Sequence, residues 1–157
     1  MTATKVRLNG QSVLDALRTT LAAVVSLLLA RLLKLPEYYW APISSIVIIQ
    51  STIDPLTVSW QRFAGTAVGA VLGGILATLV HPNVAVYAAG ILLCGIVCAW
   101  LRLEGAYRFA AITLSIVVLI AHVRPPWIVA THRFIEVSLG IAVGLMVALV
   151  WRRPRAI

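Results

Sequence analysis

Three charged residues lie inside apolar stretches that are otherwise almost free of charge. Arg62 lies about five residues into one stretch, and Arg133 and Glu136 lie about six and nine residues into another. A charge at the centre of a membrane helix costs about 2.5–3.5 kcal/mol on insertion scales, so such residues are rare unless they have a use. Because a guanidinium group binds a carboxylate through two hydrogen bonds, the arginines predict an anionic solute. Glu136 could then carry a proton.

Two structural alternatives stay open for these charges. The arginines could extend their side chains to the headgroup region, and Arg133 could simply pair with Glu136, which follows three residues later on a helix. Arg18, about two turns inside the first apolar stretch, faces the same choice.

Two short apolar stretches carry most of the remaining polar groups. Single Ser and Thr residues in membrane helices usually bond to their own backbone, so only their concentration here makes them candidates. The full set of candidate substrate-binding residues is Arg62, Arg133, Glu136, Ser45, Gln50, Thr66, Thr113, Ser115, Trp40 and Arg18. We find no catalytic cluster, metal-ligand spacing or phosphate loop, so we expect no enzyme, metal or cofactor. Cys94 and Cys98 are interpreted as packing residues.

The composition is that of an integral membrane protein. Of 157 residues, 61% are hydrophobic and 11% charged, against about 45–50% and about 25% in soluble domains. We expect an all-α chain, one membrane domain over residues 1–157 with no soluble domain. Its six predicted transmembrane helices span about residues 12–35, 38–52, 57–80, 84–102, 106–122 and 127–151. Ser12 with Asp15 predicts a capping box for the first helix, and Asn83 predicts a cap for the fourth.

The aromatic and basic residues predict the orientation. Trp40, Trp60, Trp100, Trp127 and Trp151 all fall near predicted helix ends, where aromatic rings favour the headgroup region. Seven basic residues (Lys5, Arg7, Arg102, Arg108, Arg152, Arg153 and Arg155) lie on the side of the termini, and three (Arg31, Lys34 and Arg124) on the other. This bias predicts a bacterial inner-membrane protein with both termini cytoplasmic. The formal net charge of +8 fits anionic lipids, and nucleic acid is not an expected partner.

The two halves of the sequence resemble each other. At an offset of 71 residues, Arg62 matches Arg133, Gly69 matches Gly140 and Gly73 matches Gly144; upstream, Ser45-Ile46-Val47 matches Ser115-Ile116-Val117 at an offset of 70. Each half holds three helices, so we expect two inverted repeats, about 12–80 and 84–151, which is a transporter architecture. Convergence of apolar helices is the alternative.

Glycines recur on the helix faces that carry Arg62 and Arg133, so both arginines are expected to point toward protein. Gly65, Gly69 and Gly73 are four residues apart, and Gly140 and Gly144 repeat the spacing. Small residues at this spacing let two membrane helices pack closely, so these glycines predict helix packing.

Several stretches resemble a known family. LRTTLAAVVSLLLARLLKLPEYYWAPISSIVIIQSTI, SWQRFAGTAVGAVLGGIL and HRFIEVSLGIAVGLMVALVWRRP are similar to the fusaric acid resistance and aromatic acid exporter family, whose superfamily includes the plant aluminium-activated malate channels. The sharpest elements are Pro36-x-x-Tyr39-Trp40-Ala41 and Arg62-x-x-Gly65-Thr66-x-x-Gly69. The resemblance implies export of hydrophobic organic or aromatic carboxylates and assembly into at least a dimer. Many members are longer, with a cytoplasmic domain and a second membrane block.

The expected function is therefore a homo-oligomeric transporter or channel that exports organic, especially aromatic, carboxylate anions. The expected partners are the chain itself, the anion, anionic lipids and a periplasmic or membrane subunit. The alternative is a membrane scaffold that transports nothing and packs with a partner protein.

Overall fold

The protein is an all-α bundle over the residues that the computed structural model describes, which are 10–81, 83–103, 105–120 and 124–151. The helices are α1 (Gly10–Leu32), α2 (Trp40–Ile49), α3 (Pro55–Leu79), α4 (Val84–Trp100), α5 (Tyr107–Ile120) and α6 (Pro126–Val150). By length and composition, α1, α3 and α6 can each cross a membrane, and α2, α4 and α5 are shorter apolar helices. The predicted six-helix membrane class is confirmed.

Local sequence explains where the helices begin. Asp54 accepts hydrogen bonds from the backbone N–H groups of Leu56 (3.1 Å) and Thr57 (3.3 Å), and Pro55 opens α3, so this helix starts two residues before the predicted 57. The predicted cap at Asn83 is confirmed, since its side chain accepts from Val86 N at 2.9 Å. The predicted Ser12 cap is wrong, because α1 has already begun by Gly10.

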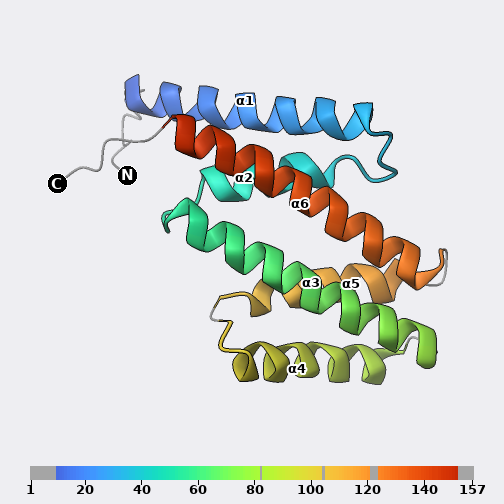
Figure 1. Ribbon diagram of the computed structural model, residues 1–157. Coiled ribbons are helices and arrows are strands. Elements are labelled where there is room, and N and C mark those ends of the chain that lie inside the picture. The colour runs from blue at the N-terminus through green and yellow to red at the C-terminus, as the bar shows by residue number, and fades with distance from the viewer. Residues whose placement is uncertain (1–9, 82, 104, 121–123, 152–157) are drawn as a thin grey trace, which may run out of the picture.

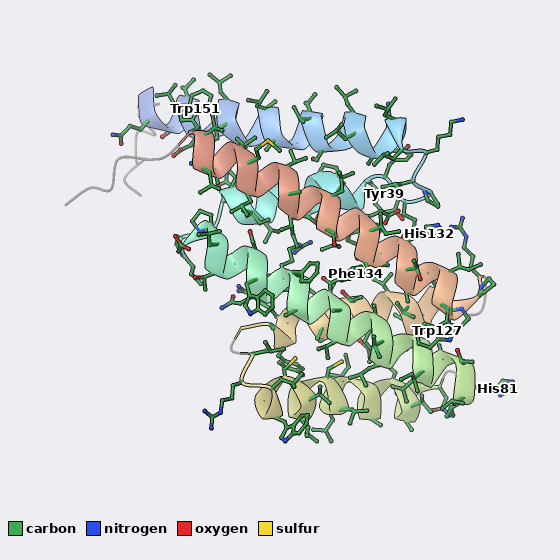
Figure 2. The ribbon with its side chains drawn as sticks, in the orientation of Figure 1. Tyr39, His81, Trp127, His132, Phe134 and Trp151 are labelled. Atoms are coloured by element: carbon green, nitrogen blue, oxygen red, sulfur yellow. The ribbon has the colours of Figure 1, made fainter. Side chains whose placement is uncertain are left out.

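Tryptophans lie at the helix ends as predicted, with one exception. Trp40 is the first residue of α2, Trp100 is the last of α4, and Trp127 and Trp151 lie at opposite ends of α6 (Figure 2). Trp60 lies six residues into α3. Of the basic residues behind the predicted orientation, Lys5, Arg7, Arg152, Arg153 and Arg155 lie outside the described residues.

The two longest helices form the centre of the bundle. α3 packs against α6, α5 packs along α3, and α2 packs along α6. α1 covers the α2–α6 pair on one side, and α4 covers the α3–α5 pair on the other (Figure 1). The helix neighbours of the first half thus recur in the second half.

The two outer helices, α1 and α4, share the geometry of their C-terminal turns and the spacing of their buried residues. α1 and α4 each end in a Schellman turn, with Lys34 at φ 53° and Arg102 at φ 54° in the left-handed conformation. Both helices bury residues four positions apart: Ala22, Ser26 and Ala30 in α1, and Gly90, Cys94 and Cys98 in α4. The expected packing role of the cysteines agrees with this burial. The two helices run in opposite directions (Figure 1).

Glycines hold the short helices at backbone contact. A Cβ on Gly69 would meet the Ala110 carbonyl oxygen and lie 2.9 Å from Thr113 Cβ, and a Cβ on Gly140 would meet the Ala41 carbonyl oxygen. Gly140 also faces Ser44, so the contacts match Ser44 with Thr113 at an offset of 69 residues. The sequence alignment of Ser45 with Ser115, at 70, is therefore one residue out of register with the packing.

Candidate functional site

Both intramembrane arginines are buried against aromatic rings from the short helices. Arg133 is 2% exposed, and its Cζ lies 3.5 Å from the centroid of the Trp40 ring. Arg62 is 8% exposed, and its Cζ lies 5.0 Å from the Phe109 centroid. Protein atoms surround both side chains, so neither arginine lies exposed on the outer surface of the bundle. Each arginine instead makes a cation–π contact inside the bundle.

Arg62 also bonds to α2. Its Nη2 donates to Ser44 Oγ at 3.1 Å, and that hydroxyl donates to the Trp40 carbonyl at 2.9 Å. Arg62 Nε has no hydrogen-bond partner among the described residues. The side chain therefore links α3 to α2 and α5 and keeps a donor uncommitted.

Glu136 binds a backbone amide of another segment. Its Oε1 accepts from Glu37 N at 2.9 Å, in the turn that leads into α2. The residue is 0% exposed, and Oε2 has no hydrogen-bond partner within the described part of the chain. Arg133 makes no direct ion-pair contact with Glu136 there, although the two charges attract each other at a longer distance. Arg133 Nε and Nη1 are likewise without described partners.

Glu37 organises the same end of the bundle, and sequence reasoning missed it. Its Oε2 accepts from Trp40 Nε1 at 3.1 Å, and its Oε1 lies 3.9 Å from Nη1 of Arg124. Glu37 is 9% exposed. The signal was available in the sequence, because Glu37 is an acid between two apolar segments in a chain with five acids in all.

The structure gathers only part of the predicted site. Arg62, Arg133, Glu136 and Trp40 lie together where α2, α3 and α6 meet, and Ser44 joins them. Arg62 and Arg133 are close enough to repel each other electrostatically. Glu136 and Glu37 in turn attract Arg133, so the cluster combines two arginines with two acids, and its unbonded guanidinium N–H groups are suited to an anion.

The other candidates have different neighbours. Ser45 lies 3.1 Å from Ser26 Oγ on α1, and Ser115 lies 3.0 Å from Tyr87 Oη on α4. Thr66 and Thr113 are buried, Thr113 against Gly69. Ser45, Ser115 and Thr113 thus contact neighbouring helices.

The last two candidates make their hydrogen bonds in the N-terminal half of α1. Gln50 is exposed and donates from Nε2 to Thr19 Oγ1 at 2.8 Å. Arg18 donates from Nη2 to the Ala148 carbonyl at 3.1 Å, near the C-terminal end of α6, where a cation favours the helix dipole.

A groove between α3 and α4 has the wrong chemistry for a carboxylate. It has a volume of about 280 Å³ and is lined by Ala67, Val68, Val71, Leu72 and Val97. All these side chains are apolar, and none of the arginines lines it. The charged cluster between α2, α3 and α6 is therefore the candidate site.

Comparison with known proteins agrees with the membrane fold. A family model described as fusaric acid resistance protein-like matches residues 22–147. The chain is 34% identical over 146 residues to a Salmonella typhimurium protein named "Uncharacterized transporter YdhK" and 33% identical to the Escherichia coli K12 protein of that name. These alignments cover 86% of this chain and 22% of each relative, so the chain spans about a fifth of the length of these curated relatives. No solved structure matches.

Proposed function

The chain belongs to the fusaric acid resistance protein-like family, and on that premise we propose that it is a membrane transporter or channel for organic carboxylate anions, aromatic ones in particular. Export is the proposed direction. The transporter name of the relatives in two bacteria supports the general class, and the chemistry of the site supports the choice of solute.

The pair of buried arginine–aromatic contacts carries this proposal. Arg62 against Phe109 and Arg133 against Trp40 each place guanidinium N–H donors beside an apolar ring. A guanidinium group binds a carboxylate, and an aromatic ring packs against the apolar body of an aromatic acid. Together the two features match the charged part and the apolar part of such a solute.

We further propose that the two halves are inverted repeats that rock against each other. The recurring helix contacts, the matched Schellman turns and the opposite directions of α1 and α4 support this arrangement. In transporters built from such repeats, the solute binds near the interface between halves. The arginine pair lies beside the α3–α6 contact, which is that interface.

The remaining expectations are also proposals. We propose a homo-oligomer in the bacterial inner membrane, with both termini in the cytoplasm and anionic lipids around the basic ends. A further membrane or periplasmic subunit is a proposed partner, and the greater length of the YdhK relatives is compatible with it.

A non-transporting scaffold is the second candidate, and one observation favours it. Gly69 and Gly140 hold α5 and α2 at backbone contact with α3 and α6, so the short helices fill the space that a pore would need. In a transporter these helices have to move apart, and in a scaffold they stay as they are.

The test is uptake of radiolabelled benzoate by liposomes that contain only this purified chain. Saturable uptake that falls at least tenfold in Arg62→Ala and Arg133→Ala supports the transporter. Arg31→Ala is the matched control, because Arg31 is an exposed arginine stacked on Tyr38. No uptake by protein that is helical and monodisperse leaves the scaffold and a transporter that needs its partner subunit.

A further inference from the structure

Glu136 is an internal carboxylate at a position where the fold does not require one. At the offset of 71 residues, Glu136 corresponds to Gly65. A Cβ on Gly65 would meet the Ala106 carbonyl oxygen, in the turn before α5, so there the two segments touch directly. In the other half the Glu136 side chain reaches the equivalent turn before α2 and bonds to Glu37 N at 2.9 Å. Packing alone is achieved with glycine, so the carboxylate has another role.

The groups around Glu136 are those that bind a carboxylate. The turn before α2 offers the Glu37 N–H, and the N-terminus of α2, a ten-residue helix, adds its positive dipole end. Tyr39, at the N-cap position, makes no side-chain capping bond. Arg133, one turn from Glu136 on α6, is 2% exposed, rests on the first residue of α2 and has Nε and Nη1 without described partners.

The bonding of Glu136 is incomplete for a permanent structural ion. Only Oε1 has a hydrogen bond within the described part of the chain, and Oε2 is buried without one. A buried carboxylate costs several kcal/mol unless its oxygens are satisfied. Arg133 could supply two more donors, yet it forms no ion pair with Glu136 in this structure. Arg133 therefore attracts the Glu136 carboxylate and still keeps N–H donors for a second carboxylate.

We propose that Glu136 is a tethered competitor: its carboxylate occupies an anion site formed by the turn before α2 and Arg133, and a free organic carboxylate binds there by displacing it. The ligand class rests on the proposed function, and the site itself rests on the geometry. Displacement breaks the Glu136–Glu37 hydrogen bond and so removes one of the contacts between α6 and the start of α2.

The test is calorimetric titration of the detergent-solubilised chain with sodium benzoate. Glu136→Ala empties the site and should lower the Kd at least tenfold relative to the natural sequence. Glu136→Gln keeps the shape and removes the charge, so it should lower the Kd by a smaller factor; it also serves if the alanine variant does not fold. Adding Arg133→Gln to either variant should abolish the gain. Asp54→Asn removes a carboxylate from the exposed cap of α3 and should leave the Kd unchanged.

Other outcomes overturn the proposal. A Kd that is unchanged or higher in folded Glu136→Ala and Glu136→Gln, or a gain that survives Arg133→Gln, shows that Glu136 does not compete for this site. Glu37→Gln separates competition from general charge removal, because it deletes a nearby negative charge and keeps the Glu37 N–H. An equal gain in Glu37→Gln also overturns the proposal.

Binding and uptake together show whether the competitor proposal or the transport proposal fails. Arg133-dependent benzoate binding in Glu136→Ala without liposome uptake leaves the competitor intact and refutes transport by this chain. Saturable uptake with a benzoate Kd that Glu136→Ala does not change supports transport and refutes the competitor.

Discussion

Phe63 of α3 and Phe134 of α6 contact each other, with ring centroids 5.0 Å apart and ring planes at 55°. The two residues are equivalent at the offset of 71, and each follows one of the buried arginines. A residue meets its own counterpart only near an axis that relates two halves of a structure. The contact therefore marks the proposed pseudo-twofold axis, and the arginines lie beside it.

The adjacent serines of α2 should have different effects, because they face different helices. Ser44 Oγ accepts from Arg62, whereas Ser45 lies 3.1 Å from Ser26 of α1. Ser44→Ala removes the group that holds the guanidinium, and we expect a severalfold higher KM for benzoate uptake. Ser45→Ala should leave KM unchanged and lower the free energy of unfolding by about 0.6 kcal/mol, a typical value for such bonds in membranes. Liposome uptake and thermal unfolding measure the two effects. A larger KM change in Ser45→Ala would contradict this assignment.

Gly69→Ala should destabilise the bundle far more than Gly95→Ala. A Cβ on Gly69 meets the Ala110 carbonyl oxygen and lies 2.9 Å from Thr113 Cβ, while a Cβ on Gly95 lies 3.4 Å from the Tyr107 ring. Overpacking costs about 1–3 kcal/mol, whereas alanine at a roomy helix position gains up to about 1 kcal/mol over glycine. Thermal unfolding followed by circular dichroism should show opposite shifts. Equal shifts would mean that the α3–α5 spacing is not set by Gly69.

The sequence predicted the helices because apolar length determines them. Each of the six apolar runs became a helix, with ends within about three residues of the prediction. The helix ends depend on local capping residues, and the apolar pattern alone does not fix them. Asp54 and Pro55 form a clear start signal for α3, whereas Ser12 offered a false one, because α1 already includes Gly10 and Gln11.

The site was harder to predict because it depends on tertiary contacts. Helix position placed Arg62 and Arg133 on buried faces, but no pattern pairs Arg133 with Trp40, 93 residues away in the chain. The bond from Glu37 N to Glu136 involves a backbone group, and a backbone N–H has no sequence signature. Ser45 and Ser115 were selected for polarity alone, whereas their neighbours on α1 and α4 decide their role.

Cysteine labelling should place the two ends of the bundle on opposite sides of the membrane. Leu33 lies after α1 and Ile53 between α2 and α3, and both are exposed. With the termini in the cytoplasm, Leu33→Cys should react with a membrane-impermeant maleimide in intact cells, and Ile53→Cys only after permeabilisation. The natural chain is the control, because Cys94 and Cys98 are 0% and 2% exposed and should stay unlabelled. The reverse pattern would invert the orientation.

Trp40 should contribute more to stability than its counterpart Phe109, because two of its groups are engaged. Its ring lies 3.5 Å from Arg133 Cζ, and its Nε1 donates to Glu37, whereas Phe109 lies 5.0 Å from Arg62 Cζ and has no polar group. A desolvated cation–π contact is worth about 2 kcal/mol and a hydrogen bond to a charged group about 1.5–3 kcal/mol. Trp40→Leu loses both, and Trp40→Phe keeps the ring.

We therefore expect a graded loss in the free energy of unfolding. Trp40→Leu should lose most, and Trp40→Phe about half as much; Phe109→Leu should lose less than Trp40→Leu, since the longer distance weakens its cation–π contact. Unfolding in mixed micelles, followed by circular dichroism at several denaturant concentrations, measures the order. If Trp40→Phe loses as much as Trp40→Leu, the indole N–H bond to Glu37 is what matters and the ring contact with Arg133 contributes little. If the extra loss of Trp40→Leu over Trp40→Phe instead disappears when Arg133→Gln is also present, that extra loss belongs to the cation–π pair, because the ring then has no cation to bind.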